Sequence, residues 1–283
     1  MPPESAALPD RISDVPKILI FDSGVGGLSV LREVQRQNPG AELVFACDNA
    51  AFPYGVLSES ELIARVLQVM EALLNEVGAD LAVVACNSAS TVVLDSLRAE
   101  FDIPFVGVVP AIKPAAETSR TRHIGLLATP GTIVRDYTDK LIRDFASDCI
   151  VTRVGSSEMV HFAEQKLRGE VPDSDAIKAI LQPFTEPHVD QPNIDTVILA
   201  CTHFPLLIEE LEPQMPSHVR WIDSGPAIAR RVSSLVNTQS KEQKKQSVKK
   251  THRAIMTSDD QRRDALNQAT KRFGLEPFEI LAI

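Results

Sequence analysis

The sequence lacks the features that mark several large classes of protein. None of its apolar runs approaches the roughly 20 residues that a helix needs to cross a bilayer. The polar, proline-bearing start at Met1–Val15 also differs from a signal peptide. We therefore expect a cytoplasmic protein that makes no membrane contact, with a leader at residues 1–16.

Positive charge and aromatic residues are both in short supply. The formal net charge is −9 and 5% of the residues are aromatic, so the sequence offers neither a basic patch nor a set of stacking rings. This composition argues against a nucleic-acid partner.

Recognisable metal and nucleotide motifs are missing as well. The four cysteines are widely spaced and form no C-x-x-C pair, which argues against a zinc site and predicts free thiols in a reducing compartment. The glycine-rich turn Gly24–Gly27 follows the predicted strand Lys17–Phe21, but it matches neither G-x-G-x-x-G nor a Walker A loop. We therefore expect no metal and no cofactor, although a phosphate-binding turn stays an alternative.

Two stretches of similar design stand out in what the sequence does contain. In Leu81–Thr91 an unbroken apolar run of strand length ends in Ala-Cys, followed by small and polar residues that suit the start of a helix. The stretch Thr196–Pro205 repeats this arrangement around a second Ala-Cys. Both Cys86 and Cys201 are thus predicted at the carboxyl ends of buried strands, where open α/β sheets bind ligands.

Strands and helices alternate along the chain. Ser58 and Glu61 form a capping-box pattern, and Gly78 is placed to end the helix that follows it. A strand at His218–Gly225 is predicted to lead the chain back to the first domain. The remaining strands are predicted at Glu42–Ala46, Ile103–Val109, His123–Ala128 and Ile150–Val154, with edge strands at Ala254–Met256 and Ile280–Ile283.

The fold class is therefore predicted as α/β, with two pseudo-symmetric domains. Each domain is expected to be a mostly parallel sheet flanked by helices, with the active site in the cleft between them. The first domain is expected at residues 17–110 and 223–283, and the second at residues 111–222. Facing halves of this kind bring both thiols to one cleft.

Two thiols without a cofactor motif suit an enzyme that inverts a carbon centre. One base removes a proton from one face of the carbon, and a conjugate acid supplies a proton to the other face. A cysteine pKa near 8.5 is compatible with one thiolate and one thiol being present together. Asp22 and His203 are candidates for setting the protonation state of the nearer thiol, although Asp22 is also a candidate helix cap.

Five motifs carry a resemblance to a known family. They stand in the family's order, and the match runs from about Lys17 to the carboxyl end. With these motifs the chain closely resembles the glutamate racemase family, and they are Asp22–Ser29, Pro53–Gly55, Ala85–Ser90, Ala128–Thr132 and Cys201–Leu207.

The resemblance implies cofactor-independent interconversion of L- and D-glutamate, which supplies D-glutamate for peptidoglycan. It implies that Cys201 deprotonates L-glutamate and Cys86 deprotonates D-glutamate, with Glu164 as an auxiliary carboxylate. The substrate contacts that it implies are Asp22, Ser23, Tyr54, Gly55, Asn87, Ser88, Thr202 and His203.

One position departs from the family pattern, which usually has Asn-Thr after the first cysteine. Ser88 keeps the hydroxyl of the usual threonine, so we expect activity to be retained. The leader and the segment Val108–Ala115 resemble the subgroup that is activated by UDP-N-acetylmuramoyl-L-alanine. We expect a monomer or a homodimer.

Three rival interpretations stay open at this level. An aspartate racemase of the same superfamily typically carries Cys-Thr-Glu, whereas this chain has His203 at the third position. A thiol amidohydrolase would need one cysteine with a histidine as its base, and would leave Cys86 without a role. A non-catalytic module that uses the glycine turn would bind phosphate ligands without either cysteine.

Overall fold

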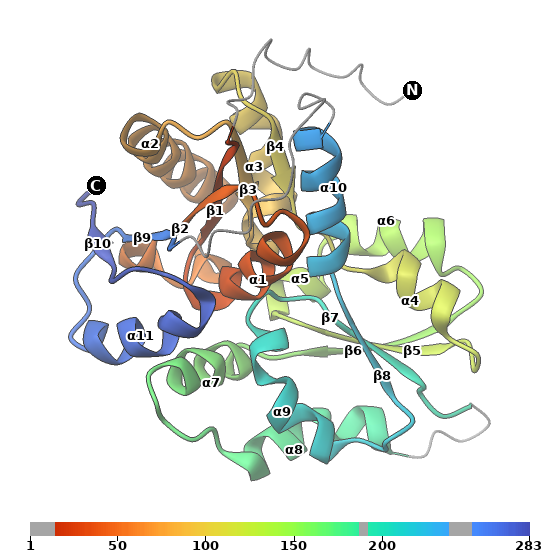
Figure 1. The fold of residues 1–283 in the computed structure, drawn as a ribbon. Coiled ribbons are helices and arrows are strands. Elements are labelled where there is room, and N and C mark those ends of the chain that lie inside the picture. The colour runs from red at the N-terminus through yellow and green to blue at the C-terminus, as the bar shows by residue number, and fades with distance from the viewer. Residues whose placement is uncertain (1–14, 187–191, 238–250) are drawn as a thin grey trace.

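The computed structural model describes residues 15–186, 192–237 and 251–283, so the predicted leader lies outside the described residues up to position 14. The first sheet is parallel throughout and holds the amino-terminal strands (Figure 1). Its strand order is β10 (Glu279–Ile280), β9 (Arg253–Met256), β2 (Glu42–Cys47), β1 (Lys17–Asp22), β3 (Leu81–Val84) and β4 (Phe105–Gly107).

A second parallel sheet repeats the arrangement. Its order is β6 (Ile150–Gly155), β5 (His123–Ala128), β7 (Thr196–Leu199) and β8 (Arg220–Asp223). This order, β6-β5-β7-β8, is the same as the order β2-β1-β3-β4 in the first sheet. The predicted fold class, with two pseudo-symmetric α/β halves, is confirmed. We call the two halves the first and second lobes.

The central strands β1, β2 and β3 of the first sheet are buried on both faces, which explains their continuous apolar runs. In β1, Ile18 and Ile20 join one core cluster while Leu19 and Phe21 join another. The helices α1 (Leu28–Gln37) and α10 (Gly225–Asn237) pack together against the first of these faces. The opposite face is covered by α2 (Glu59–Val77) and α3 (Asn87–Glu100).

The helix α2 begins and ends where the sequence predicts. The Ser58 hydroxyl accepts a hydrogen bond from the backbone N–H of Glu61, whose side chain accepts one from the backbone N–H of Ser58. Gly78 ends the helix in the left-handed conformation, with φ of 61°. Such a conformation suits a residue without a Cβ.

The second sheet is also covered on both faces. The helices α4 (Ile112–Thr118) and α6 (Asp136–Phe145) lie against one face. The helices α7 (Glu158–Leu167), α8 (Ser174–Thr185) and α9 (Ile208–Leu211) lie against the other, and their core is continuous with the α1 and α10 side of the first lobe. A short helix, α5 (Pro130–Ile133), follows β5.

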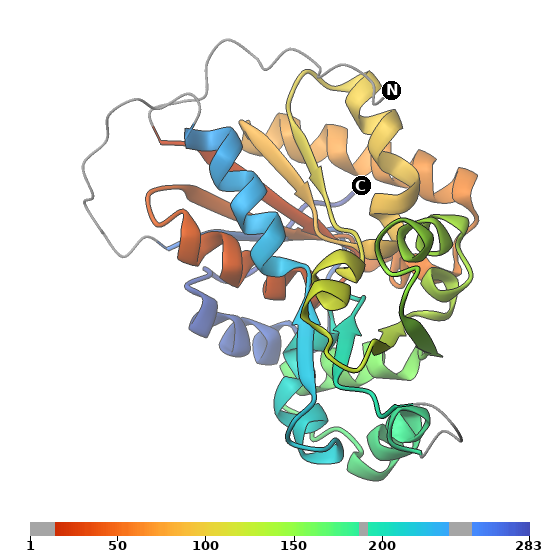
Figure 2. The same ribbon diagram turned by 90° about the vertical axis from the view of Figure 1, so that its right-hand side faces the viewer.

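The chain passes between the lobes twice, and the two crossings touch. The first crossing leaves β4, and the second follows β8 (Figure 2). Between them, the Ser224 hydroxyl donates a hydrogen bond to the backbone carbonyl of Val109. The strand β8 pairs with β7 and therefore belongs to the second lobe. The chain returns to the first lobe only after Asp223, where this strand ends. The exact domain limits stay a prediction.

After α10, the carboxyl-terminal segment adds β9, α11 (Arg263–Thr270) and β10 to the first lobe. The strand β9 lies inside the sheet, between β2 and β10, and is therefore no edge strand. In Figure 1, α11 lies beside α7 of the second lobe, and the two helices are in contact. None of the helices within the described ranges is long and apolar enough to span a membrane.

Candidate active site

A pocket of about 300 Å³ is lined by residues of both lobes. Cys86 and Cys201 both contribute to it, each two residues beyond the end of its strand. Ten of the eleven predicted site residues line this pocket: Asp22, Ser23, Tyr54, Gly55, Cys86, Asn87, Ser88, Cys201, Thr202 and His203. The eleventh, Glu164, lies behind it and contacts His203.

Cys86 has an environment that keeps its proton in place. The residue precedes α3 and is 7% exposed. Burial raises the pKa of the Cys86 thiol well above its usual range, and the nearby Asp22 carboxylate raises it further. Charge burial without an opposite charge disfavours the thiolate. The structure therefore favours a protonated sulfur on this side.

Asp22 lies at the end of β1 and joins the two lobes. One carboxylate oxygen accepts hydrogen bonds from the backbone N–H and the hydroxyl of Ser23, and the other accepts one of 3.0 Å from Thr202. Its side chain is fully buried, and burial raises its pKa although His203 and these hydrogen bonds oppose the shift. Asp22 caps no helix through its side chain in this structure.

Cys201 has a different partner. Its sulfur lies 3.8 Å from Nδ1 of His203, whose Nε2 lies 2.9 Å from Oε1 of Glu164. Burial disfavours a charged imidazole, but the hydrogen bonds to Cys201 and Glu164 prevail and raise the pKa of His203 well above its usual range. His203 thus lies between the Cys201 sulfur and a buried carboxylate.

Glu164 supplies the negative charge that this imidazolium needs. It is 6% exposed and also accepts a hydrogen bond of 2.8 Å from the backbone N–H of Val25. Burial alone would raise its pKa, but the hydrogen bond and charge of His203, with Arg168 and Val25, lower it to about 2. Glu164 is therefore ionised at neutral pH.

The turn after β1 approaches this pair so closely that it has no room for side chains. A Cβ added at Gly24 would overlap Oε1 of Glu164, and one added at Gly26 would overlap Nδ1 of His203. Both glycines come from the predicted motif, and their role is close approach of the backbone.

Tyr54 is held by contacts away from the pocket. Its hydroxyl donates a hydrogen bond of 2.7 Å to Asp48, which also binds the Arg65 guanidinium and the Thr257 hydroxyl. These partners lower the pKa of Asp48 although burial opposes them. Gly55, next to Tyr54, is exposed and leaves the pocket mouth open.

Asn87 and Ser88 begin α3 directly beside Cys86. Among the described residues, Oδ1 of Asn87 is a buried side-chain oxygen without a hydrogen-bond partner. A buried acceptor of this kind is costly unless a donor reaches it. The residue lines the pocket, although the oxygen itself is buried.

The sequence interpretation missed several lining residues. Phe52 packs against the His203 and His161 rings, while Thr129, Pro130 and Gly131 reach the pocket from the turn after β5. The turn Thr129–Gly131 carried a signal, because it stands in one of the quoted motifs. His161 and Val160 are ordinary residues of α7, and nothing in their spacing singled them out.

The described residues contain no group of three or more histidine, cysteine, aspartate or glutamate side chains arranged to hold a metal ion. All four cysteines are free thiols. What the pocket offers is therefore two sulfurs from opposite lobes, one beside a carboxyl group and the other beside an imidazole that is paired with a buried carboxylate.

Comparison with known proteins gives a consistent result. The family model for Asp/Glu/Hydantoin racemase matches residues 19–232. The chain is 44% identical over 270 residues to a glutamate racemase of Vibrio parahaemolyticus, a match that covers 95% of this chain and 96% of that protein. It is 46% identical over 268 residues to a glutamate racemase of Escherichia coli strain S88, a match that covers 95% of this chain and 92% of that protein.

Solved structures agree with the sequence matches. The crystal structure of Escherichia coli glutamate racemase in complex with L-glutamate and the activator UDP-MurNAc-ala is similar with a TM-score of 0.87 and 45% identity, covering 95% of this chain and 98% of that one. A glutamate racemase from Aquifex pyrophilus is similar with a TM-score of 0.68 and 28% identity, covering 94% and 98%.

Proposed function

The chain belongs to the Asp/Glu/Hydantoin racemase family and, within it, to the glutamate racemases, and from this premise we propose that Cys86 and Cys201 are the two bases of the reaction. The observation that carries the proposal is that one pocket receives a thiol from each lobe, each with a different ionisable partner. The product D-glutamate is a building block of peptidoglycan.

In the direction from L- to D-glutamate, the Cys201 thiolate removes the α-proton. The electron pair of the broken C–H bond passes into the substrate carboxylate as an enediolate-like carbanion. The Cys86 thiol then protonates the opposite face of the carbon, so that Cys201 ends as the thiol and Cys86 as the thiolate. The reverse reaction exchanges these roles, and no other proton donor or acceptor is consumed.

The different surroundings of the thiols support this assignment. His203 lies 3.8 Å from the sulfur of Cys201, while burial and Asp22 favour the thiol form of Cys86. An enzyme in which Cys86 carries the proton is ready for L-glutamate. Conversion of D-glutamate requires the proton to be on Cys201 first.

Polar groups around the pocket are suited to hold the substrate. The hydroxyl of Ser88 suits a carboxylate, as does the backbone at the start of α3, whereas the hydroxyls of Ser23 and Thr202 donate to Asp22. Preorganised donors at a developing negative charge lower the barrier of such a reaction.

Proton NMR in D2O without any added cofactor tests the proposal. We expect the α-proton signal of L-glutamate to disappear while its optical rotation falls, and we expect L-aspartate to stay unchanged. The variants Cys86→Ala and Cys201→Ala should both abolish racemisation. Full racemisation by either variant would overturn the two-thiol assignment, and acyl-enzyme formation on an amide substrate would favour a hydrolase.

We also infer that UDP-N-acetylmuramoyl-L-alanine activates the enzyme. This inference is supported by the 45% identical Escherichia coli protein, whose crystal structure contains UDP-MurNAc-ala as an activator. The test is the rate of glutamate racemisation by the full chain with and without saturating precursor. An unchanged rate would contradict the inference.

A further inference from the structure

Arg168, at the end of α7, has contacts that the reaction as proposed does not use. Its Nη1 donates a hydrogen bond of 2.6 Å to Oε2 of Glu164, and its Nη2 donates one of 2.8 Å to Oδ2 of Asp260. Glu164 belongs to the second lobe, whereas Asp260 lies in the loop after β9 of the first lobe. The guanidinium fork therefore binds two carboxylates from opposite lobes at once.

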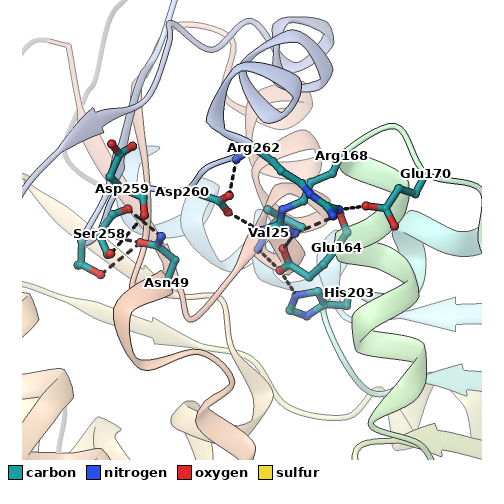
Figure 3. A network of polar contacts seen from close by, with 11 residues as sticks. Val25, Asn49, Glu164, Arg168, Glu170, His203, Ser258, Asp259, Asp260 and Arg262 are labelled. Carbon is teal, nitrogen blue, oxygen red and sulfur yellow. Dashed lines mark hydrogen bonds and ion pairs between the residues drawn. The ribbon is translucent and has the colours of Figure 1, made fainter.

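The two carboxylate oxygens of Glu164 have different hydrogen-bond partners. Oε1 accepts hydrogen bonds from His203 and from the backbone of Val25, and Oε2 accepts one from Arg168 (Figure 3). The two oxygens of an ionised carboxylate are equivalent, so exchanging them would leave the His203 contact unchanged. Arg168 instead restrains the plane and the position of the carboxylate, because it holds the oxygen that His203 and Val25 do not bind.

The contacts form an unbroken chain to the sulfur. From Asp260 it passes through Arg168, Glu164 and His203, and it ends at Cys201. The first three links join charged groups, and the last joins Nδ1 of His203 to the sulfur of Cys201 at 3.8 Å. A displacement of Arg168 therefore reaches the reacting atom through the orientation of His203.

The charged and titratable groups around this chain are few. Glu164 faces His203 and Arg168, and Arg168 faces Glu164 and Asp260. Asp22 also acts on the charge of His203. Burial raises the pKa of Cys47 well above its usual range, Glu164, Asp22 and Asp48 raise it further, and Arg168 lowers it. Cys47 stays neutral, so it adds no charge.

A second ion pair nearby provides a comparison. Arg262 pairs with Glu170, so it also joins the loop after β9 to the end of α7. Figure 3 shows that Arg262 and Arg168 both bind a carboxylate of this region, but no contact of the Arg262 side chain reaches Glu164 among the residues described. If Arg168 acted only as a tether between the lobes, the two arginines would be equivalent.

We propose that Arg168 is a positioning residue of the reaction, which holds Glu164 so that His203 keeps the orientation and charge that Cys201 needs to take up the α-proton of L-glutamate. This inference rests on the proposed function. It assigns no contact with substrate to Arg168.

Steady-state kinetics of Arg168→Met test the inference. We expect kcat/KM to fall roughly 10-fold or more, as for loss of a hydrogen bond between charged groups. Because L- and D-glutamate have equal free energies, kcat/KM falls equally in both directions whichever thiol is affected. The rate alone therefore does not identify the damaged side.

Primary isotope effects identify it. Proton transfer at Cys201 becomes the slower step in the variant. For L-glutamate with deuterium at the α-carbon, Cys201 removes the deuterium, so the isotope effect on kcat/KM should rise. For D-glutamate Cys86 removes it in the faster step, so the isotope effect should fall. The acid limb of the kcat/KM profile should also move to higher pH, since Glu164 without Arg168 binds a proton more readily. A general loss of packing would change neither the ratio of the two isotope effects nor the position of the acid limb.

Two further variants complete the experiment. Arg262→Met is the matched control, and it should keep the wild-type kcat/KM, isotope effects and pH profile. Arg168→Lys keeps the charge but loses the fork, so we expect an intermediate rate and an acid limb near that of the wild type. Thermal unfolding of each variant reports whether it is folded.

The outcomes separate the two proposals. Loss of activity in Arg168→Met with unaltered isotope effects in both directions would overturn the positioning role, as would equal damage in Arg262→Met. A wild-type enzyme that does not exchange the α-proton of glutamate at all would instead contradict the proposed function.

Discussion

At the scale of single residues, the turn after β1 uses glycines because its backbone lies too close to Glu164 and His203 for a side chain to fit. Gly24 and Gly26 let the turn after β1 touch Glu164 and His203, two groups that come from the other lobe. The glycine motif therefore has a steric purpose. It brings the backbone N–H of Val25 within 2.8 Å of the buried carboxylate.

The variant Gly26→Ala tests this interpretation. The new Cβ would overlap His203 and Thr202, and a shift of about 1 Å near reacting groups costs on the order of 100-fold in rate. We expect kcat/KM to fall by about that factor. Gly40→Ala is the control, since a Cβ there meets nothing within 4 Å, and it should keep wild-type activity.

The ionisation of Glu164 makes a further prediction at this scale. Its pKa is lowered to about 2 in the folded protein from an ordinary value of 4.5. A lowered carboxyl pKa contributes stability above pH 4.5, and this contribution, about 3 kcal/mol, is lost as the pH falls toward 2.

Urea unfolding of the wild type and of Glu164→Gln measures that contribution. The difference between their free energies of unfolding should be largest above pH 4.5 and should shrink as the pH is lowered. A difference that stays constant with pH would contradict the assignment of a low pKa to Glu164.

At the scale of elements, the start of α2 is set by one capping box. Ser58→Ala removes the side-chain acceptor of the Glu61 N–H, and we expect a loss of about 1 kcal/mol in the free energy of unfolding. Ser60→Ala, two residues further into the same exposed end, should have a smaller effect. Chemical denaturation measures both, and racemase activity should be unchanged in both variants.

The positions of individual strands and helices were the features of the fold that the sequence predicted best. The strands β1, β2 and β5 agree with their predicted ranges to within one residue, and β3 and β7 lie at the start of the stretches Leu81–Thr91 and Thr196–Pro205. Central parallel strands are apolar on both faces, which makes them visible in the sequence. The capping box and Gly78 define α2 in the same local way.

Predictions that depend on distant contacts were weaker. The strand predicted at His218–Gly225 is β8, Arg220–Asp223, but its pairing with β7 joins distant residues and has no local sequence signal. The last strand, Glu279–Ile280, is shorter than the predicted apolar run and begins one residue earlier. The ion pair between Arg168 and Asp260 joins residues 92 positions apart, and no local pattern announces it.

At the scale of the whole molecule, the ligand pocket is shared between the lobes. A ligand that binds the folded protein at 100 times its dissociation constant adds about 2.7 kcal/mol to the free energy of unfolding. We therefore expect saturating glutamate to raise the unfolding temperature by several degrees.

This prediction is best measured with the double variant Cys86→Ser and Cys201→Ser, which cannot interconvert the enantiomers. Both L- and D-glutamate should stabilise it, because a racemase binds both, while L-aspartate should have little effect. Stabilisation by one enantiomer alone would contradict a pocket that accepts both.

The contact between Ser224 and Val109 has a mechanical consequence. The two crossings between the lobes are bonded side by side, so they form a common pivot. A rotation of one lobe about this pivot would change the gap between the sulfurs of Cys86 and Cys201. A pair of fluorescent labels, one on each lobe, would therefore follow the reactive geometry itself during turnover.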